Sequence, residues 1–186
     1  MSYLRIVFLL SFCCCLFVLP AQAVKIEISA PGEQRIPLAI APLLPIDSAP
    51  RVGVAEPFQQ VLQNDLDLSG LFELVDPESF LGDAGRLTLR STEVDFAQWR
   101  LLGAEAVIKG GYRFEGEKLV IEMRLYDVIT RRLLTGRSYK GTLKGIRQIA
   151  HRFADLVLQG LTGEMGPFSS RIAYISNRTG RKELYL

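Results

Sequence analysis

The stretch that decides the fold is AEAVIKGGYRFEGEKLVIEMRLYDVITRRLLTGRSY, residues 104–139. Turn-forming residues at 115–117 and 130–132 divide it into three extended runs. The middle run alternates in polarity, and its apolar face is formed by Leu119, Ile121, Met123 and Leu125. Such alternation is typical of a strand with one buried face. The sequence therefore predicts an antiparallel meander with strands at 104–114, 118–126 and 133–139.

The segment before this meander predicts strands and helices in alternation. Residues 36–44 form an apolar run, which Pro37 and Pro42 should restrict to strand ends or to a sheet edge. A helix should begin near Pro57 and end at Ser69-Gly70, because its apolar residues recur at helical spacing. Residues 71–75 predict a short strand, and residues 82–94 have no clear period and predict a loop.

Two more helices are expected. Asp95 and Gln98 stand in a capping relation at the start of a short helix that Gly103 ends. Thr142 should cap a longer helix that ends at Gly163. On that helix, the solvent side is predicted to carry Lys144, Arg147, Arg152 and Asp155. The order of elements implies an α/β fold, a mixed sheet with helices packed on it.

Residues 1–23 have the pattern of a secretory signal peptide. Arg5 precedes an apolar run from Ile6 to Leu19, and small residues before Val24 predict cleavage between Ala23 and Val24. An uncleaved anchor is the alternative, although the run is shorter than the roughly 17–25 residues of a membrane span. The three cysteines at positions 13–15 lie inside the apolar run, so we expect them to leave with it. A lipoprotein would instead carry a lipidated cysteine as its first mature residue.

Cleavage would remove one arginine and no acidic residue, so the formal charge falls from +2 to +1. A near-neutral chain argues against nucleic acid or an anionic membrane surface as the main partner. The mature chain would have no cysteine, so burial alone must hold its fold. Its length suits one domain with a substantial core, which we place at residues 24–165.

The first mature residues form a candidate binding element. Residues 24–29 alternate, with Val24, Ile26 and Ile28 on one face and Lys25, Glu27 and Ser29 on the other. This pattern predicts a strand, and the breaker residues 30–33 set it apart from the following domain.

The last segment, residues 166–186, predicts a hairpin. Its strands fall at 171–175 and 183–186, and residues 177–180 form the turn. Because a lone hairpin is marginally stable in water, we expect these residues to begin a β domain that the sequence truncates.

Residues suited to catalysis are scarce. The single histidine, His151, is expected on the flank of an amphipathic helix, and no second histidine or mature cysteine is present to build a metal site. The sequence has no Gly-x-Ser-x-Gly elbow, and Gly110-Gly111 matches no phosphate-binding pattern. These glycines should relieve crowding in a strand or allow a bulge. We therefore expect no catalytic residue, cofactor or metal.

Five segments in a fixed order resemble the TolB family of the Tol-Pal system. They are VKIEI at 24–28, IPLAIAP at 36–42, LSGLF at 68–72, GAEAVIKG at 103–110, and LTG at 161–163 followed by RIAYI at 171–175. This resemblance implies a small N-terminal α/β domain, followed by the first hairpin of a six-bladed β-propeller.

The same resemblance implies a non-enzymatic adaptor in the periplasm that supports outer-membrane integrity and cell division. The mature N-terminal strand, residues 24–29, would bind TolA. The propeller would bind the lipoprotein Pal, on blades that lie beyond Leu186.

Two other classes stay open at this point. Propellers also occur in serine exopeptidases, whose catalytic set would lie downstream of Leu186. A stand-alone periplasmic α/β module, such as a peptidoglycan-synthesis activator, would need no propeller. The position of the native stop codon would discriminate among the three.

Overall fold

The computed structural model describes residues 35–47, 50–171 and 173–185. The predicted signal peptide, its cleavage site and the predicted strand at 24–29 lie outside these residues. Within the described ranges, no helix is both long enough and apolar enough to cross a membrane.

Five strands form one mixed sheet in the order β2-β1-β3-β4-β5. Their bounds are β1 Ile36–Pro45, β2 Phe72–Leu74, β3 Ala106–Glu115, β4 Lys118–Asp127 and β5 Arg132–Gly141. Strand β1 runs parallel to both of its neighbours, whereas β3, β4 and β5 form the predicted antiparallel meander. The predicted α/β fold with a mixed sheet is confirmed.

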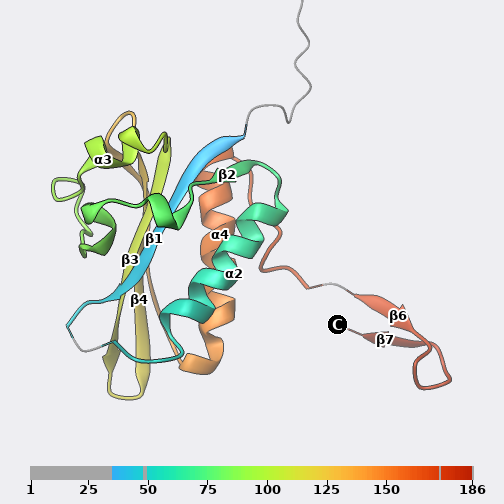
Figure 1. Cartoon of the computed structure of the whole chain (residues 1–186). Coiled ribbons are helices and arrows are strands. Elements are labelled where there is room, and N and C mark those ends of the chain that lie inside the picture. Colours follow the sequence, from blue (N-terminus) through green and yellow to red (C-terminus); the bar gives the residue numbers. More distant parts are fainter. Residues whose placement is uncertain (1–34, 48–49, 172, 186) are drawn as a thin grey trace, which may run out of the picture. The chain divides into compact units, whose positions relative to one another are not determined.

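The helices cover both faces of the sheet (Figure 1). Helices α2 (Ala55–Leu68) and α4 (Ile146–Thr162) pack side by side on one face. The other face carries α3 (Phe96–Leu101) and an irregular segment with the 3₁₀ turns η1 (Pro77–Ser79) and η2 (Gly82–Gly85). A third 3₁₀ turn, η3 (Leu143–Gly145), leads into α4.

The first face holds the larger core. Helix α2 contributes Phe58, Val61, Leu62 and Leu66, and α4 buries Ile149, Phe153 and Val157 against them. The sheet supplies alternate residues, such as Leu38 and Ile40 of β1 and Leu119, Ile121 and Leu125 of β4. Successive side chains of a strand point to opposite faces, so these residues all meet the two helices.

The second face uses the residues in between. Ala39 and Ala41 of β1, Val107 of β3 and Tyr126 of β4 meet Phe96 and Trp99 of α3. Phe80 packs edge to face on Trp99 with ring centroids 5.2 Å apart. One period-two pattern thus divides the sheet between two separate clusters.

The prolines of β1 lie near its end or beside an open edge, as the sequence predicts. Strand β1 stands between β2 and β3 in the sheet order, but β2 pairs only with residues 36–38, so the stretch that holds Pro42 has β3 alone as a neighbour. Pro37 is only its second residue, and Pro42 lies within the register shift between Ile40 and Leu43. A residue without an N–H is tolerated at such an irregularity because the ladder bond is already interrupted there.

The glycine pair relieves crowding, as predicted. A Cβ on Gly110 would lie 2.3 Å from Met123 Sδ and 2.9 Å from the Glu122 carbonyl oxygen. A Cβ on Gly111 would lie 2.7 Å from Leu87 and 2.8 Å from Ile46, on the opposite face. The register between β3 and β4 is unbroken here. On the β1 side the register shifts between Ile40 and Leu43, and Leu43 then pairs with Gly110, so an irregularity does adjoin the glycines.

The helix ends agree with the sequence in part. Asp95 caps α3 by accepting from the amides of Ala97 and Gln98, and Gly163 ends α4 with a φ of 85°. Thr142 is not a side-chain cap of α4, because η3 intervenes and Gly145 occupies the cap position.

Asp155 corrects another prediction. This residue lies 4% exposed instead of on the solvent side of α4. Its carboxylate accepts hydrogen bonds from the amides of Phe168 and Ser169 and from the Ser169 hydroxyl. The carboxylate thereby ties the chain that follows α4 back onto the helix.

Strands β6 (Tyr174–Ser176) and β7 (Glu183–Tyr185) form the predicted C-terminal hairpin. Gly180 has a φ of 86° in the turn and donates to the Asn177 carbonyl. Tyr174 and Tyr185 stack across the pair at 5.4 Å. The assignment of this hairpin to a propeller stays a prediction.

Candidate partner-binding segment and its surroundings

The residues predicted to bind a partner, Val24 to Ser29, lie outside the described residues, as do Ala23 and the predicted cleavage site. The structure does show where the chain joins the described domain. Ile36 is the first residue of β1, and its amide donates to the Leu71 carbonyl at 2.9 Å. Ile36 pairs with Phe72, the first residue of β2. The chain therefore enters the sheet beside its shorter edge strand.

An apolar hollow of about 490 Å³ lies at the same end of the sheet. Its lining includes Leu68 and Leu71 after α2, Leu158 of α4, and Pro167 and Phe168. Leu68 and Leu71 are exposed. Side chains of this kind at the entry point of a chain can hold an extended apolar segment.

Strand β5 is the opposite edge of the sheet and is much longer than β2. Leu133 and Leu134 are exposed on it. Arg132, Arg137 and Lys140 interrupt this surface, and edge strands with such charges resist unwanted pairing.

A buried ion pair fixes the irregular segment on the second face. Lys109 Nζ lies 2.7 Å from Asp83 Oδ2 and donates to the Asp83 carbonyl at 2.6 Å. Trp99 Nε1 donates to the same carboxylate at 2.7 Å. The side chains of Lys109 and Asp83 are only 2% and 1% exposed. Burial lowers the pKa of Lys109, although the hydrogen bond and charge of Asp83 oppose that shift.

Sequence reasoning missed this cluster. Lys109 follows two apolar residues in a predicted strand, and Asp83 lies in a segment without periodicity. A lysine inside an otherwise apolar strand was the available signal, because such a residue needs a partner when both faces are covered. All the contacts described for Lys109 and Asp83 are with other atoms of the protein, which indicates a structural role.

His151 bridges the two helices of the first face. Its Nδ1 lies 2.6 Å from Asp65 Oδ2 of α2, and its side chain is 28% exposed. This is the helix-flank position that the sequence predicts. Within the described residues, no group of three His, Cys, Asp or Glu residues could hold a metal ion.

Comparison with known proteins identifies the fold. The family described as TolB amino-terminal domain matches residues 24–134. The crystal structure of TolB from Acinetobacter baumannii superposes with a TM-score of 0.59 at 23% identity. That alignment covers 77% of this chain and 32% of the crystallised one. It shows the same arrangement of helices on a mixed sheet.

Relatives of known name extend along the chain. The Tol-Pal system protein TolB of Syntrophotalea carbinolica is 54% identical over 98% of this chain and 42% of its own length. The protein of the same name from Geobacter sulfurreducens is 32% identical over 91% of this chain and 38% of its own length. The chain thus spans about two fifths of the length of these relatives. These matches show that the chain belongs to the TolB family of Tol-Pal system proteins.

Proposed function

We propose that this chain acts as a non-enzymatic periplasmic adaptor of the Tol-Pal system, contributing to outer-membrane integrity and cell division. The observation that carries the proposal is the 54% identity to a Tol-Pal system protein TolB over 98% of the chain. The partner of the N-terminal part is TolA, which binds the mature N-terminal strand, residues 24–29. Pal binding belongs to the propeller and not to residues 24–165.

Strand addition is the binding mode that suits residues 24–29. Backbone hydrogen bonds to an edge of a TolA sheet supply much of the affinity, because they need no particular side chain. Ile26 and Ile28 fill alternate pockets, while Lys25 and Glu27 select the partner. The position of Ile36 beside Leu71 supports this arrangement, since the chain reaches the domain at its periphery.

The competing hypothesis is that residues 24–29 complete a sheet of this domain. Both states are compatible if the segment is docked in one and released in the other. The fraction that is released then limits the apparent affinity for TolA.

Calorimetry with a shortened chain that begins at Gly32 tests the proposal. We expect TolA binding to be lost while Trp99 fluorescence and the helical circular dichroism stay unchanged. An Ile26→Pro change in the chain starting at Val24 should also abolish binding, because it removes a ladder donor and fixes φ. Unchanged TolA affinity in the well-folded shortened chain would rule out the strand as the binding element.

Periplasmic localisation has its own test. Mass spectrometry of the exported protein should give the mass of a chain whose first residue is Val24. An N-terminus that retains Cys13 to Cys15, or one that carries lipid, would contradict the proposed cleavage.

A further inference from the structure

The hydrogen-bond ladder between β1 and β2 stops before β1 does. Its last bond runs from the Val75 amide to the Leu38 carbonyl at 3.0 Å. Backbone groups of alternate residues point to the same side of a strand, so the Ile40 N–H and C=O face the edge that β2 leaves open. β2 pairs with β1 only from Ile36 to Leu38, so among the described strands none continues this edge beside Ile40. A strand edge without a neighbour offers its N–H and C=O groups to an incoming strand.

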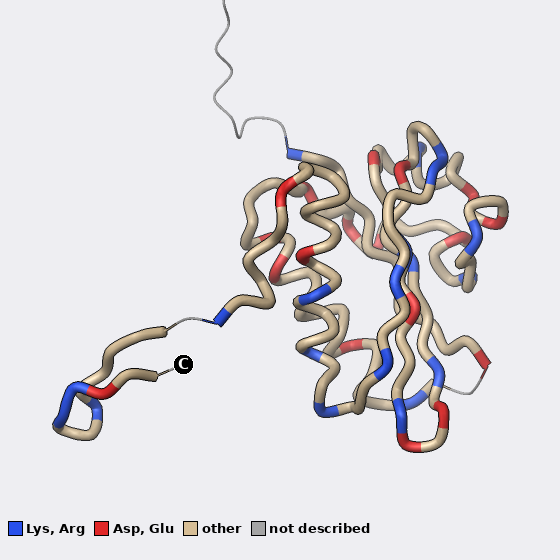
Figure 2. The backbone as a smooth tube through the Cα atoms, turned by 180° about the vertical axis from the view of Figure 1, so that it is seen from behind, with Lys and Arg blue, Asp and Glu red and all other residues tan. Residues whose placement is uncertain are grey.

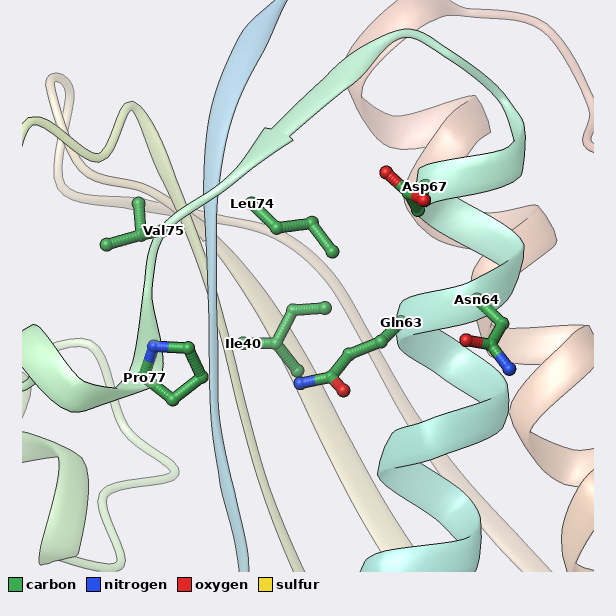
Figure 3. Close-up of a pocket in the computed structure, with 7 residues that line it drawn as sticks. All are labelled: Ile40, Gln63, Asn64, Asp67, Leu74, Val75 and Pro77. Carbon is green, nitrogen blue, oxygen red and sulfur yellow. The ribbon is translucent and has the colours of Figure 1, made fainter.

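A groove of about 280 Å³ opens at this position, as Figure 3 shows. Its α2 wall is polar and carries Gln63, Asn64 and Asp67. Its opposite wall is apolar and is formed by Leu74, Val75 and Pro77, with Ile40 between the two walls. Its volume is just below the roughly 300–1,000 Å³ of pockets for drug-sized molecules, so the groove suits a short stretch of extended chain.

The surrounding chain has one sign of charge. Residues 55–85 contain seven acidic residues and no lysine or arginine. Two of the seven are paired within the fold, Asp65 with His151 and Asp83 with Lys109. Asp67 lies exposed on the groove wall, and none of the described ion pairs includes it. The charged positions can be followed along the backbone in Figure 2.

We propose that this groove binds an extended basic segment of another polypeptide, which continues the β1 edge where β2 ends. The incoming backbone bonds to the Ile40 N–H and C=O, as in other cases of strand addition. A lysine or arginine of the segment faces Asp67, and the amides of Gln63 and Asn64 bond to its peptide groups. An alternate apolar side chain packs on Leu74 and Val75.

Charge complementarity selects this occupant. An acidic segment would meet Asp67 and its acidic neighbours, and like charges oppose binding. The proposed contacts use Ile40, Asp67 and the α2 amides, none of which belongs to residues 24–29, so the proposal does not rest on the TolA contact. The shortened chain beginning at Gly32 should therefore lose TolA binding and retain peptide binding at the groove.

Titration of the purified chain with three blocked hexapeptides tests the occupant. The probes alternate lysine with valine, glutamate with valine, and serine with valine. We expect the lysine peptide to bind more tightly than the serine peptide and the glutamate peptide not to bind. N-methylation of alternate amides of the lysine peptide should abolish binding, because it removes the ladder donors. Equal binding of the methylated peptide, or of the glutamate peptide, would overturn the proposal.

A matched pair of substitutions locates the site. Asn64→Lys places a positive charge on the groove wall and should weaken lysine-peptide binding about five- to tenfold. Gln60→Lys makes the same change in net charge on the exposed surface of α2, outside the groove lining, and should have little effect. Both sites are exposed, so folding should be preserved. Equal losses in the two variants would show general charge attraction and overturn the assignment.

Amide exchange gives a readout at the proposed contact itself. Saturation with the lysine peptide should slow exchange at the Ile40 amide in the full chain. No slowing there, with binding otherwise intact, would place the peptide elsewhere and overturn the proposal. Sedimentation equilibrium tests whether a second copy of this chain occupies the groove instead. Self-association of the parent chain that Asn64→Lys abolishes would assign the groove to that second copy and overturn the proposal.

Discussion

The two faces of the sheet are held by different forces. Helices α2 and α4 cover the first face with an apolar core, in which Phe58, Leu62 and Phe153 are fully buried. The second face is covered by a short helix and irregular chain, and a buried lysine–aspartate pair lies beneath that cover. The packing of α2 and α4 is stabilised mainly by the apolar surface that it removes from water. The packing of α3 and the irregular segment also depends on one directional polar contact.

This difference predicts how each face fails. An apolar core loses stability gradually as side chains are trimmed, because its contacts are many and individually weak. A buried ion pair fails abruptly, because removing one partner leaves the other charged and without compensation. The single tryptophan, Trp99, donates to Asp83 and therefore reports on the second face alone.

The largest expected effect comes from Lys109→Met, which leaves the Asp83 carboxylate buried without its cation. We expect a loss of about 3–5 kcal/mol in the free energy of unfolding. Urea unfolding followed by Trp99 fluorescence should show an early transition, while circular dichroism at 222 nm reports the later loss of α2 and α4.

Lys140→Met is the matched control. Lys140 pairs with Glu115 on the surface, where its side chain is 54% exposed. Such pairs contribute roughly 0–1 kcal/mol, so this variant should unfold much like the parent. Coincident fluorescence and dichroism transitions in Lys109→Met would show that the two faces are not separable.

Alanine substitutions at two neighbouring glycines compare how tightly the two faces are packed. Gly110→Ala directs its methyl group at Met123 Sδ and the Glu122 backbone on the first face, and should cost about 1–3 kcal/mol. Gly111→Ala meets side-chain atoms of Leu87 and Ile46 on the second face, which can move, and its backbone contact, 3.1 Å from the Leu44 carbonyl oxygen, is looser than the 2.9 Å contact at Gly110. We therefore expect a smaller loss from Gly111→Ala, visible mainly in Trp99 fluorescence. A larger loss from Gly111→Ala would mean that the irregular cover is the more rigid of the two.

The same contrast explains what the sequence could predict. The first face was predictable because Phe58, Val61 and Leu62 recur at helical spacing and β4 alternates with period two. The second face was not, because burial there depends on Asp83, a residue in a segment without periodicity. Its partner Lys109 is 26 residues away along the chain. A local sequence pattern cannot indicate a contact between residues so far apart in the chain.

The candidate sites divide in a similar way. The alternation of residues 24–29 is a local pattern, so these residues alone are enough to predict a strand there. The groove beside Ile40 could not be predicted, because it exists only where the three residues of β2 end against a longer β1. Register and strand length are tertiary properties, and one residue of shift would turn Ile40 to the other neighbour.

The smallest expected effect concerns two tyrosine hydroxyls, one from each face. Tyr126 lies in the second cluster and Tyr139 packs against the first core, and neither hydroxyl has a hydrogen-bond partner among the described residues. A buried hydroxyl without a partner is costly, so Tyr126→Phe and Tyr139→Phe should each raise the free energy of unfolding at pH 7 by about 1 kcal/mol. A loss in either variant would indicate that the hydroxyl is satisfied after all.

The pH dependence of the same two variants sharpens this test. Burial raises the pKa of both tyrosines from 10 to about 12. Between these values the unfolded chain releases the phenolic proton before the folded chain does. The free energy of unfolding is therefore kept in full below pH 10 and falls as the pH rises through 12. The parent should therefore lose stability over this window more steeply than either phenylalanine variant. Lys109 does not produce this trend, because its lowered pKa makes its contribution rise with pH up to about 10.5. Urea unfolding at pH 9, 10 and 11 measures the slopes, and parallel slopes for the parent and Tyr126→Phe would show that this hydroxyl is not buried in solution.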